Sequence, residues 1–304
     1  MEFIMGIDIG GTEVKLGKFI AGKLVTKSSL KTDISDYGNN IVNDIFLAID
    51  KLSVGDKIVG IGIGVPGPVL QGKVLGAQNL GWEEVDLASK FHQRYKNIKV
   101  VVLNDANAAT YGELAYGAAS GYHSLVMLTL GTGIGGGIVI NDQLLEGATG
   151  AAGEVGHLRV SEVNPRHCTC GLFGCLEQYS SATGVLKTAY ELRKGQETAL
   201  NKPNLTCKEV FDYAKSGDAI ALNVVESMTD YLASGCASIA DIVNPEIILL
   251  GGGLSKAGEF LRAKVENKFK NLCFYAVNKT KFAIATLGND AGIYGAMHAV
   301  GKIL

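Results

Sequence analysis

Three of the chain's six cysteines fall within eight residues, in the run HCTCGLFGC. Cys168, Cys170 and Cys175 offer three thiolates, which are ligands that zinc favours. Gly171 and Gly174 let the loop between them fold tightly enough to surround one ion. A tetrahedral site needs a fourth ligand, which the three thiolates leave open. The run therefore predicts a metal site, with a redox cysteine pair or a metal-free turn as the alternatives.

Two glycine–threonine turns, in DIGGT and LGTGIGGG, have the composition of phosphate-binding turns. Each follows an apolar strand and leads into a second one, and its glycines let a ligand approach the backbone N–H groups closely. The segments around them, 3–24 and 124–145, share the order strand, turn, strand, two-residue turn, strand, which indicates a duplicated β-meander. The candidate phosphate contacts are Gly10, Gly11, Thr12, Gly131, Thr132 and Gly133.

Two aspartates lie at the ends of apolar strands. Asp105 closes the strand IKVVVLN and opens a helix, which would hold its carboxylate at a strand's carboxyl end, where α/β proteins form clefts. It is a candidate catalytic base, and the structural alternative is a helix N-cap or first-turn acid. Asp8 either organises a metal or phosphate or closes a β-turn. The residues alone leave both choices open.

The elements that must position these residues alternate between strands and helices, which indicates an α/β protein. Strands are expected at FIMGIDIG, KIVGIGIGV, IKVVVLND, SLVMLTLG, GGIVI, EIILLGGG and KFAIATLG. Helical spacing appears in five segments, 37–52, 86–96, 105–117, 218–243 and 289–303. Two G-x-G-x-x-G matches, at 62–67 and 131–136, run into a proline and a strand where a dinucleotide site needs a helix, which argues against a dehydrogenase.

Composition limits the partners. With 304 residues, 47% hydrophobic content and a formal net charge of −2, the chain can bury a large core, and we expect two lobes. It lacks the positive net charge that favours binding to nucleic acid or to anionic membranes, so small molecules are the expected partners. The start has no basic leader, and no apolar run reaches the roughly 20 residues that span a bilayer, so we expect a cytoplasmic protein.

The order of the motifs resembles the ROK family of sugar kinases and repressors, over nearly the whole chain. The motifs that carry the resemblance are DIGGT at 8–12, GVPGPV at 64–69, NDANAA at 104–109, LGTGIGGG at 130–137, EVGH at 154–157, C-x-C-G-x-x-G-C-x-E at 168–177, GGGLS at 251–255 and LGNDAG at 287–292. Within the family, the segments GVPGPV, NLGW and GAAGEVGH are most similar in sequence to the bacterial glucokinases.

The resemblance implies an α/β fold of two lobes, actin-like or hexokinase-like (ribonuclease H-like), with ATP and sugar in a cleft between the lobes. The small lobe would comprise residues 1–117, completed by a C-terminal helix at 289–304, and the large lobe 118–288. The resemblance also suggests a homodimer.

The resemblance further implies an ATP-dependent hexose kinase that transfers the γ-phosphate to the sugar 6-hydroxyl. Asp105 would be the general base, Asp8 and the two turns would organise Mg²⁺ and the phosphates, and Gly252 and Gly253 would form the nucleoside wall. A tight strand-to-helix connection is the structural role for those two glycines.

The sugar contacts implied by the resemblance come from several motifs. Glu154, His157 and Glu177 would bind the anomeric-side hydroxyls, with the exposed first turn of a helix as the alternative for Glu177. His157 would also be the fourth zinc ligand and close the shell, so the metal would be structural, whereas His167 is tied beside Cys168 and would strain to share the ion. The remaining contacts are Gly67, Asn79, Asn104 and Asp105.

Among hexoses, glucose is the leading candidate, followed by N-acetylmannosamine, N-acetylglucosamine and fructose. A non-catalytic sugar-binding member of the family is the alternative to an enzyme. A family repressor would carry an N-terminal helix-turn-helix before the first phosphate turn, and here DIGGT begins at Asp8.

Overall fold

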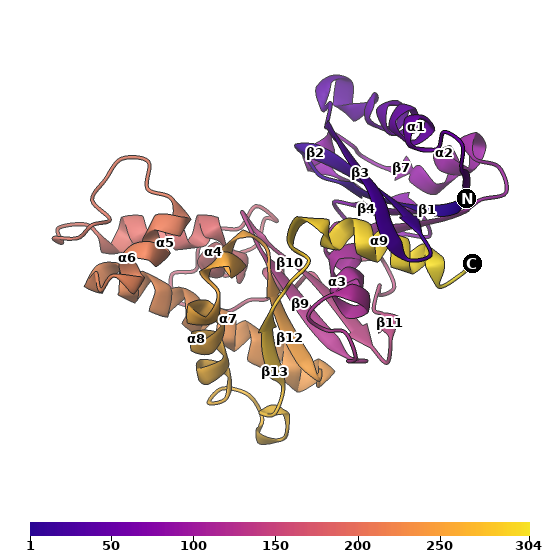
Figure 1. The fold of residues 1–304 in the computed structure, drawn as a ribbon. Helices are drawn as coiled ribbons and strands as arrows, with labels where there is room; N and C mark the ends of the chain where they lie inside the picture. Colours follow the sequence, from indigo (N-terminus) through magenta and orange to yellow (C-terminus); the bar gives the residue numbers. More distant parts are fainter. The chain divides into compact units, whose positions relative to one another are not determined.

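The structure has two five-stranded sheets, and each contains one of the two segments that share the same order of strands and turns (Figure 1). The computed structural model describes residues 1–304. The first sheet has the order β3-β2-β1-β4-β8, with β1 at Glu2–Ile9, β2 at Glu13–Ile20, β3 at Lys23–Lys31, β4 at Lys57–Val65 and β8 at Lys99–Asn104. The second has the order β11-β10-β9-β12-β13, with β9 at Leu125–Leu130, β10 at Ile134–Ile140, β11 at Gln143–Leu144, β12 at Ile247–Gly251 and β13 at Lys281–Ile284.

The duplicated meander predicted from the sequence is confirmed. The second hairpin of each meander closes through two residues of positive φ, Ala21 and Gly22 (48° and 74°) in one and Asn141 and Asp142 (50° and 64°) in the other. Such turns match the twist of the strands that they join. In each sheet the first strand of the meander pairs in parallel with the strand that follows it in the order, so the two sheets share one topology.

The chain divides into two compact units, and each combines segments that are distant in the sequence. The first comprises 1–121, 137–153 and 287–304, and the second 122–136 and 154–286. Residues 137–153, which the sequence analysis placed in the large lobe, group with the first unit. The lobe boundaries drawn from the sequence stay a prediction.

In the first unit, two pairs of helices accompany the sheet. Residues of α1 (Ile41–Leu52) and α2 (Leu87–Arg94) share one hydrophobic core with alternate residues of the strands. Helix α9 (Ala291–Gly301), yellow in Figure 1, packs against β1, β4 and α3 (Asp105–Tyr116) although it comes from the end of the chain.

Glycines in β1 and β4 allow α9 to lie directly on the strand backbones. A Cβ at Gly6 would stand 2.2 Å from the carbonyl oxygen of Ile293, and one at Gly62 would stand 1.8 Å from that of Ala296. The alternating residues of KIVGIGIGV therefore have two roles: the isoleucines pack in the core, and the glycines leave space for helix α9.

A small sheet and six 3-10 helices complete the regular structure outside the two large sheets and the α-helices. The order of the small sheet is β5-β6-β7, with β5 at Val69–Leu70, β6 at Lys73–Val74 and β7 at Val85–Asp86, and the sequence patterns did not predict it. Three of the 3-10 helices lie in the first unit: η1 (Ser35–Gly38), η2 (Gln78–Leu80) and η6 (Gly288–Asp290). A fourth, η5 (Tyr275–Val277), lies in the second unit, a short distance before β13 in the chain.

The second unit is built around one long helix, α7 (Ala219–Val243), which contacts four others. These are α4 (Glu177–Ser180), α5 (Ala182–Leu192), α6 (Cys207–Lys215) and α8 (Glu259–Phe269). Two further 3-10 turns, η3 (Val155–His157) and η4 (Gly253–Ala257), carry predicted site residues. No helix of either unit has the length and apolar character needed to cross a bilayer.

Candidate functional site

In the first unit, the two candidate aspartates lie at the same edge of the sheet. Asp8 pairs with Gly64 across β1 and β4, and Gly64 pairs with Leu103 across β4 and β8. These strands are parallel, so their carboxyl ends meet at one edge, with β1 and β8 separated by two strand spacings, about 10 Å. Asp105 follows β8 directly, and its side chain is exposed.

Asn104, and not Asp105, caps helix α3. Its Oδ1 accepts hydrogen bonds from the N–H groups of Ala106 (2.9 Å) and Asn107 (3.2 Å). Of the two structural alternatives considered for Asp105, the N-cap is wrong, because the cap falls one residue earlier, and the first-turn acid is confirmed. Asp105 is the first helical residue, where the positive end of the helix dipole favours a carboxylate, and its Oδ1 accepts from the Ala106 N–H at 2.8 Å.

The amide of Asn104 is largely used inside the protein. Its Nδ2 donates to the carbonyl oxygen of Gly67 at 3.1 Å, which ties the GVPGPV loop to the end of β8. Gly67 has a φ of 88°, and a Cβ there would stand 1.9 Å from the carbonyl oxygen of Gly76, so only glycine fits. One N–H of Asn104 remains for a ligand, and sugar contacts by Asn104 and Gly67 stay a prediction.

Asp8 lies on β1 opposite Lys15, so the β-turn role considered for it is wrong. Burial raises the pKa of its carboxyl, while Lys15, whose Nζ is 3.4 Å from Oδ2, opposes that rise. Helix α9 begins beside it: a Cβ at Gly292 would stand 2.6 Å from the Asp8 Cγ. A partly buried carboxylate without full compensation is a suitable ligand for a cation.

The first glycine–threonine turn joins β1 to β2. The Gly10 N–H donates to the carbonyl oxygen of Glu13 at 2.9 Å, whereas the N–H groups of Gly11 and Thr12 have no partner inside the protein. A Cβ on Gly11 would touch Asn79 of η2 at 3.4 Å, so this turn and the predicted sugar contact Asn79 are neighbours.

The second turn, between β9 and β10, is surrounded by the two segments that carry the other predicted sugar contacts. A Cβ on Gly133 would stand 2.8 Å from Oε2 of Glu177. A Cβ on Gly156, in η3, would stand 2.1 Å from the carbonyl oxygen of Ile134. The N–H groups of Thr132 and Gly133 have no partner inside the protein.

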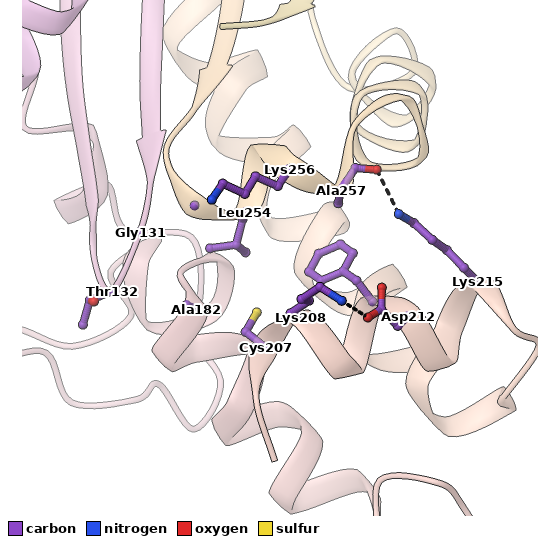
Figure 2. Close-up of a pocket in the computed structure, with 12 residues that line it drawn as sticks. Gly131, Thr132, Ala182, Cys207, Lys208, Asp212, Lys215, Leu254, Lys256 and Ala257 are labelled. Atoms are coloured by element: carbon purple, nitrogen blue, oxygen red, sulfur yellow. Dashed lines mark hydrogen bonds and ion pairs between the residues drawn. The ribbon is translucent and has the colours of Figure 1, made fainter. Parts of the chain in front are cut away.

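A cavity of about 500 Å³ opens in the second unit beside this turn (Figure 2). The apolar side chains of Phe211 and Leu254 form part of its wall, and burial raises the pKa of Cys207 to about 12, so that thiol stays neutral. Such a space suits a flat base with a charged tail beside the turn. The full lining is Gly131, Thr132, Ala182, Cys207, Lys208, Phe211, Asp212, Lys215, Gly253, Leu254, Lys256 and Ala257.

Three lysines line the cavity, and two of them are engaged within the protein. Lys208 pairs with Asp212 at 2.5 Å, and Lys215 donates to the carbonyl oxygen of Ala257 at 3.2 Å. Figure 2 shows the side chain of Lys256 extending toward the side of the cavity where the turn lies. Lys256 is exposed and forms no ion pair, so its charge is available to an anionic ligand.

Gly252 and Gly253 have different surroundings. Gly252 has a φ of 79°, and a Cβ there would stand 2.5 Å from the carbonyl oxygen of Leu130, the last residue of β9. This is the tight strand-to-helix connection expected as its structural role. Gly253 lines the cavity, and a Cβ there would have no atom within 4 Å. Its role in a nucleoside wall remains a prediction.

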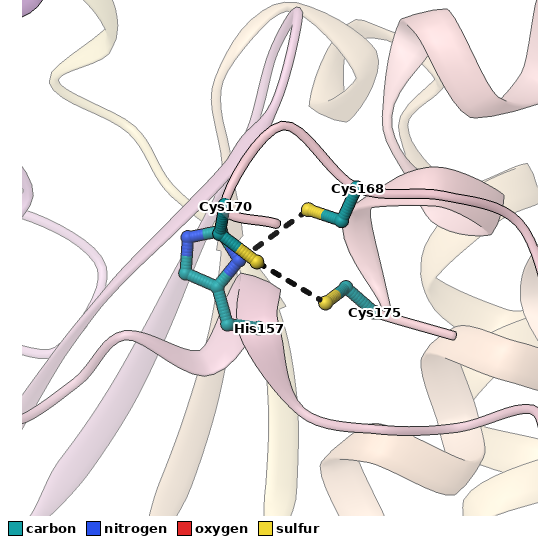
Figure 3. Close-up of side chains that lie close together, drawn as sticks. All are labelled: His157, Cys168, Cys170 and Cys175. Atoms are coloured by element: carbon teal, nitrogen blue, oxygen red, sulfur yellow. Dashed lines mark hydrogen bonds between the residues drawn. The ribbon is translucent and has the colours of Figure 1, made fainter. Parts of the chain in front are cut away.

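His157, Cys168, Cys170 and Cys175 gather their ligand atoms in one place, all within 4.8 Å of one another (Figure 3). The His157 Nδ1 is 3.7 Å from the Cys168 Sγ, and the Sγ atoms of Cys170 and Cys175 are 3.8 Å apart. A tetrahedral zinc with Zn–S bonds of about 2.3 Å separates its ligands by about 3.8 Å. The four side chains therefore fit a zinc ion.

A short hairpin brings the three cysteines together. Gly174 has a φ of 80°, and a Cβ there would stand 2.2 Å from the carbonyl oxygen of Ser161. His167 pairs with Phe173 across the hairpin, their rings 5.0 Å apart, and does not join the cluster. Burial raises the pKa of Cys175 to about 12, so a metal must displace a tightly held proton there.

Glu177 connects the cysteine cluster to the second turn. Its Oε1 lies 3.1 Å from the Cys168 Sγ and 3.3 Å from the Nε2 of Gln178, while Oε2 faces Gly133. Glu177 is also the first residue of α4, as its structural alternative anticipated, but it is half-buried and not exposed. Glu154 is exposed just before η3, and its carbonyl oxygen accepts the His157 N–H at 3.1 Å.

The sequence motifs missed the residues of the cavity that lie on α6, and they missed Lys256 of η4, whereas Gly253 of η4 was a predicted contact. The pattern Thr206-x-x-Glu209 forms a capping box and could have predicted α6, but nothing in it places Phe211 beside a phosphate turn. Lys256 adjoins the GGGLS motif and carries no signal of its own.

Comparison with known proteins gives a consistent result over the whole chain. The model of the ROK family matches residues 4–302. The chain is 40% identical to a glucokinase of Halalkalibacterium halodurans, covering 97% of this chain and 93% of that one, and 36% identical to a glucokinase of Thermotoga maritima, covering 96% and 95%. It is also similar to the solved ROK family glucokinase of Streptomyces griseus in complex with glucose and AMPPNP, with 30% identity, a TM-score of 0.81 and 99% of each chain covered.

Proposed function

This chain belongs to the ROK family, and from that membership we propose that it is an ATP-dependent hexose kinase whose substrate is glucose. It transfers the γ-phosphate of ATP to the sugar 6-hydroxyl. The observation that carries this proposal is the likeness to glucokinases along nearly the full length of both chains. The arrangement of the candidate residues supplies the chemistry.

Asp105 is proposed as the general base. Phosphoryl transfer to an alcohol needs a carboxylate that accepts the hydroxyl proton as the oxygen attacks phosphorus. Asp105 is exposed at the carboxyl edge of the first sheet, and Asn104 caps the helix in its place. The Asp105 carboxylate therefore lies at the start of α3, on an exposed residue.

The nucleotide is proposed to use the cavity of the second unit. Thr132 and Gly133 offer N–H groups without internal partners, Lys256 offers an unpaired charge, and Phe211 and Leu254 offer an apolar wall for the base. Mg²⁺, bound with the help of Asp8, would neutralise the phosphates. In the first unit, Gly10, Gly11 and Thr12 are the matching phosphate contacts.

The sugar contacts are proposed on both units. Glu154, His157 and Glu177 belong to the second, whereas Gly67, Asn79, Asn104 and Asp105 belong to the first. Zinc held by His157 and the three cysteines would leave no open coordination position, so its contribution would be to fix the loop that precedes Glu177. We also infer a homodimer, which the family resemblance supports. We further infer a location in the cytoplasm, where ATP is available.

The decisive experiment is an ADP-release assay with Mg-ATP and a panel of glucose, N-acetylmannosamine, N-acetylglucosamine and fructose at matched concentrations. We expect the highest kcat/KM with glucose. A higher value with an N-acetylated sugar or with fructose would keep the kinase and replace the substrate. Sugar binding without ADP release for any of the four would indicate a non-catalytic sugar-binding protein.

A further inference from the structure

In both glycine–threonine turns, a threonine from a distant part of the chain donates its hydroxyl to a carbonyl oxygen of the turn. In the first unit, the Thr32 hydroxyl donates to the Gly10 carbonyl oxygen at 2.6 Å, and the Thr32 N–H donates to the Thr12 carbonyl oxygen at 3.0 Å. Thr32 follows β3 and lies 22 residues from Gly10.

In the second unit, the start of α5 performs the same task. The Thr183 hydroxyl donates to the Thr132 carbonyl oxygen at 2.9 Å, and the Ala182 N–H donates to the Gly131 carbonyl oxygen at 2.9 Å. Thr183 is 51 residues from Thr132. Each turn thus has two carbonyl oxygens bound, one by a threonine hydroxyl and one by a backbone N–H. The carbonyls belong to Gly10 and Thr12 in the first turn and to Gly131 and Thr132 in the second.

The planarity of the peptide bond gives these contacts a consequence for the opposite side of each turn. In a trans peptide, the C=O of one residue and the N–H of the next point in opposite directions. Holding the Gly131 and Thr132 carbonyls toward α5 therefore directs the N–H groups of Thr132 and Gly133 away from it. Holding the Gly10 carbonyl directs the Gly11 N–H in the same manner. These three N–H groups have no partner inside the protein.

Burial does not explain why the Thr183 hydroxyl bonds to the turn. Its side chain is exposed, and water could satisfy its hydroxyl, so no desolvation penalty obliges it to bond to the turn. Thr32 is only 4% exposed, so its hydroxyl needs an internal partner in any case. Thr183 is therefore the sharper test of a role directed at a ligand.

We propose that Thr183 and Thr32 are positioning residues, which hold the carbonyls of the two turns so that the turns' N–H groups point at the phosphates of the nucleotide. The proposal rests on the proposed function only in taking a nucleotide as the anion. Preorganised N–H donors gain affinity because the ligand does not have to order them.

The test compares Thr183→Val, which removes the hydroxyl and keeps the shape, with Thr183→Ser, which restores it. Affinities of the whole protein for ATP, ADP and adenosine are measured by calorimetry without sugar. We expect Thr183→Val to weaken ATP and ADP binding by roughly 2- to 10-fold and to leave adenosine unchanged, as for loss of one hydrogen bond. Thr183→Ser should bind all three like the parent.

The pair Thr32→Val and Thr32→Ser repeats the comparison in the first unit, and Thr26→Val, on the exposed side of β3, is the matched control with no turn contact. Unchanged ATP affinity in Thr183→Val, equal weakening of adenosine, or failure of serine to restore binding would each overturn the proposal. Circular dichroism and thermal unfolding verify that each variant folds.

Because the measurement is of binding, it separates this proposal from the proposed function. A parent that binds ATP more tightly than adenosine but phosphorylates no sugar would contradict the kinase while the threonine comparison still decides the positioning role. A parent that binds ATP no better than adenosine would overturn both.

Discussion

At the scale of single residues, the ionised Asp8 carboxylate is an unfavourable charge in the first unit. Burial raises its pKa, and Lys15 at 3.4 Å compensates only in part. A pKa raised by folding means that the folded chain holds the proton more tightly than the unfolded chain, so ionised Asp8 lowers stability at neutral pH. A bound cation would remove that cost, which is consistent with a role in organising Mg²⁺ and phosphate.

We predict that Lys15→Met will shift the acid limb of the kcat/KM profile to higher pH. Removing the ammonium removes the influence that lowers the Asp8 pKa, so the carboxylate forms only at higher pH. The measurement is kcat/KM for ATP across pH 5 to 9, with Lys23→Met on β3, exposed and unpaired, as control. An acid limb that coincides in both variants would remove Asp8 from the pH dependence.

A second prediction concerns the base. Asp105→Asn keeps the size of the side chain but cannot accept the sugar proton, so kcat should fall by roughly 10²- to 10⁴-fold. Sugar affinity, measured by calorimetry, should change little, and so should thermal stability, because Asn104 provides the helix cap. Near-normal turnover would exclude Asp105 as the base.

At the scale of elements, glycines decide how closely helices approach. Helix α9 crosses α3 at two of them: a Cβ on Gly295 would stand 1.6 Å from the Ala108 carbonyl oxygen, and one on Gly112 would stand 2.3 Å from that of Ala291. Because α3 begins with Asp105, this backbone contact also determines where the candidate base lies.

Gly295→Ala should therefore lower the free energy of unfolding by about 2–3 kcal/mol or more, since the added methyl meets backbone and cannot be accommodated by a side-chain rotation. Gly301→Ala on the same helix is the control: its Cβ would stand 3.8 Å from the nearest side chain, an ordinary contact. Urea unfolding compares the two. Equal stability in the two variants would show that α9 does not need this close approach.

The cysteine hairpin is an element whose metal content can be tested. Cys175→Ser removes one thiolate, so the zinc content should fall from about one ion per chain to far less, as measured by elemental analysis. We propose that zinc in the cluster fixes the loop before Glu177. The KM for sugar should then rise more than the KM for ATP, because a displacement of about 1 Å can cost roughly 10²-fold in rate. Normal kinetics in a metal-free variant would leave the cluster with a purely structural role.

At the scale of the whole molecule, each unit is assembled from segments that are far apart in the chain. The first unit needs residues 287–304 from the end of the chain to complete it, and the second needs 122–136 to supply β9 and the second turn. The proposed sugar contacts are also divided between the units, so substrate binding should register in both.

Hydrogen exchange gives the corresponding prediction. Saturating glucose without nucleotide should slow amide exchange both around 79–105 in the first unit and around 154–177 in the second, because a ligand stabilises whatever it contacts. Galactose, which differs in one hydroxyl's orientation, is the comparison sugar. Protection confined to one unit would assign the sugar contacts to that unit alone.

By itself, the sequence determined the local features. The expected strands and the five expected helices, the two-residue turns at Ala21 and Asn141, the glycine–threonine turns and the cysteine hairpin all follow from patterns within a few residues. Helices α5, α6 and α8 were not predicted. Periodicity and turn preferences act over such short distances, so they can be read without knowledge of the rest of the chain. The family resemblance added His157 to the cysteine cluster, which the structure brings within reach.

Only the tertiary structure decided which distant groups meet. Nothing near Thr32 or Thr183 in the sequence indicates that their hydroxyls hold the carbonyls of the phosphate turns. The cavity wall on α6, Lys256 on η4 and the capping of α3 by Asn104 were likewise not predicted. Such contacts depend on how whole helices and sheets pack. That packing buries apolar residues that are distant in the sequence, and no local pattern specifies it.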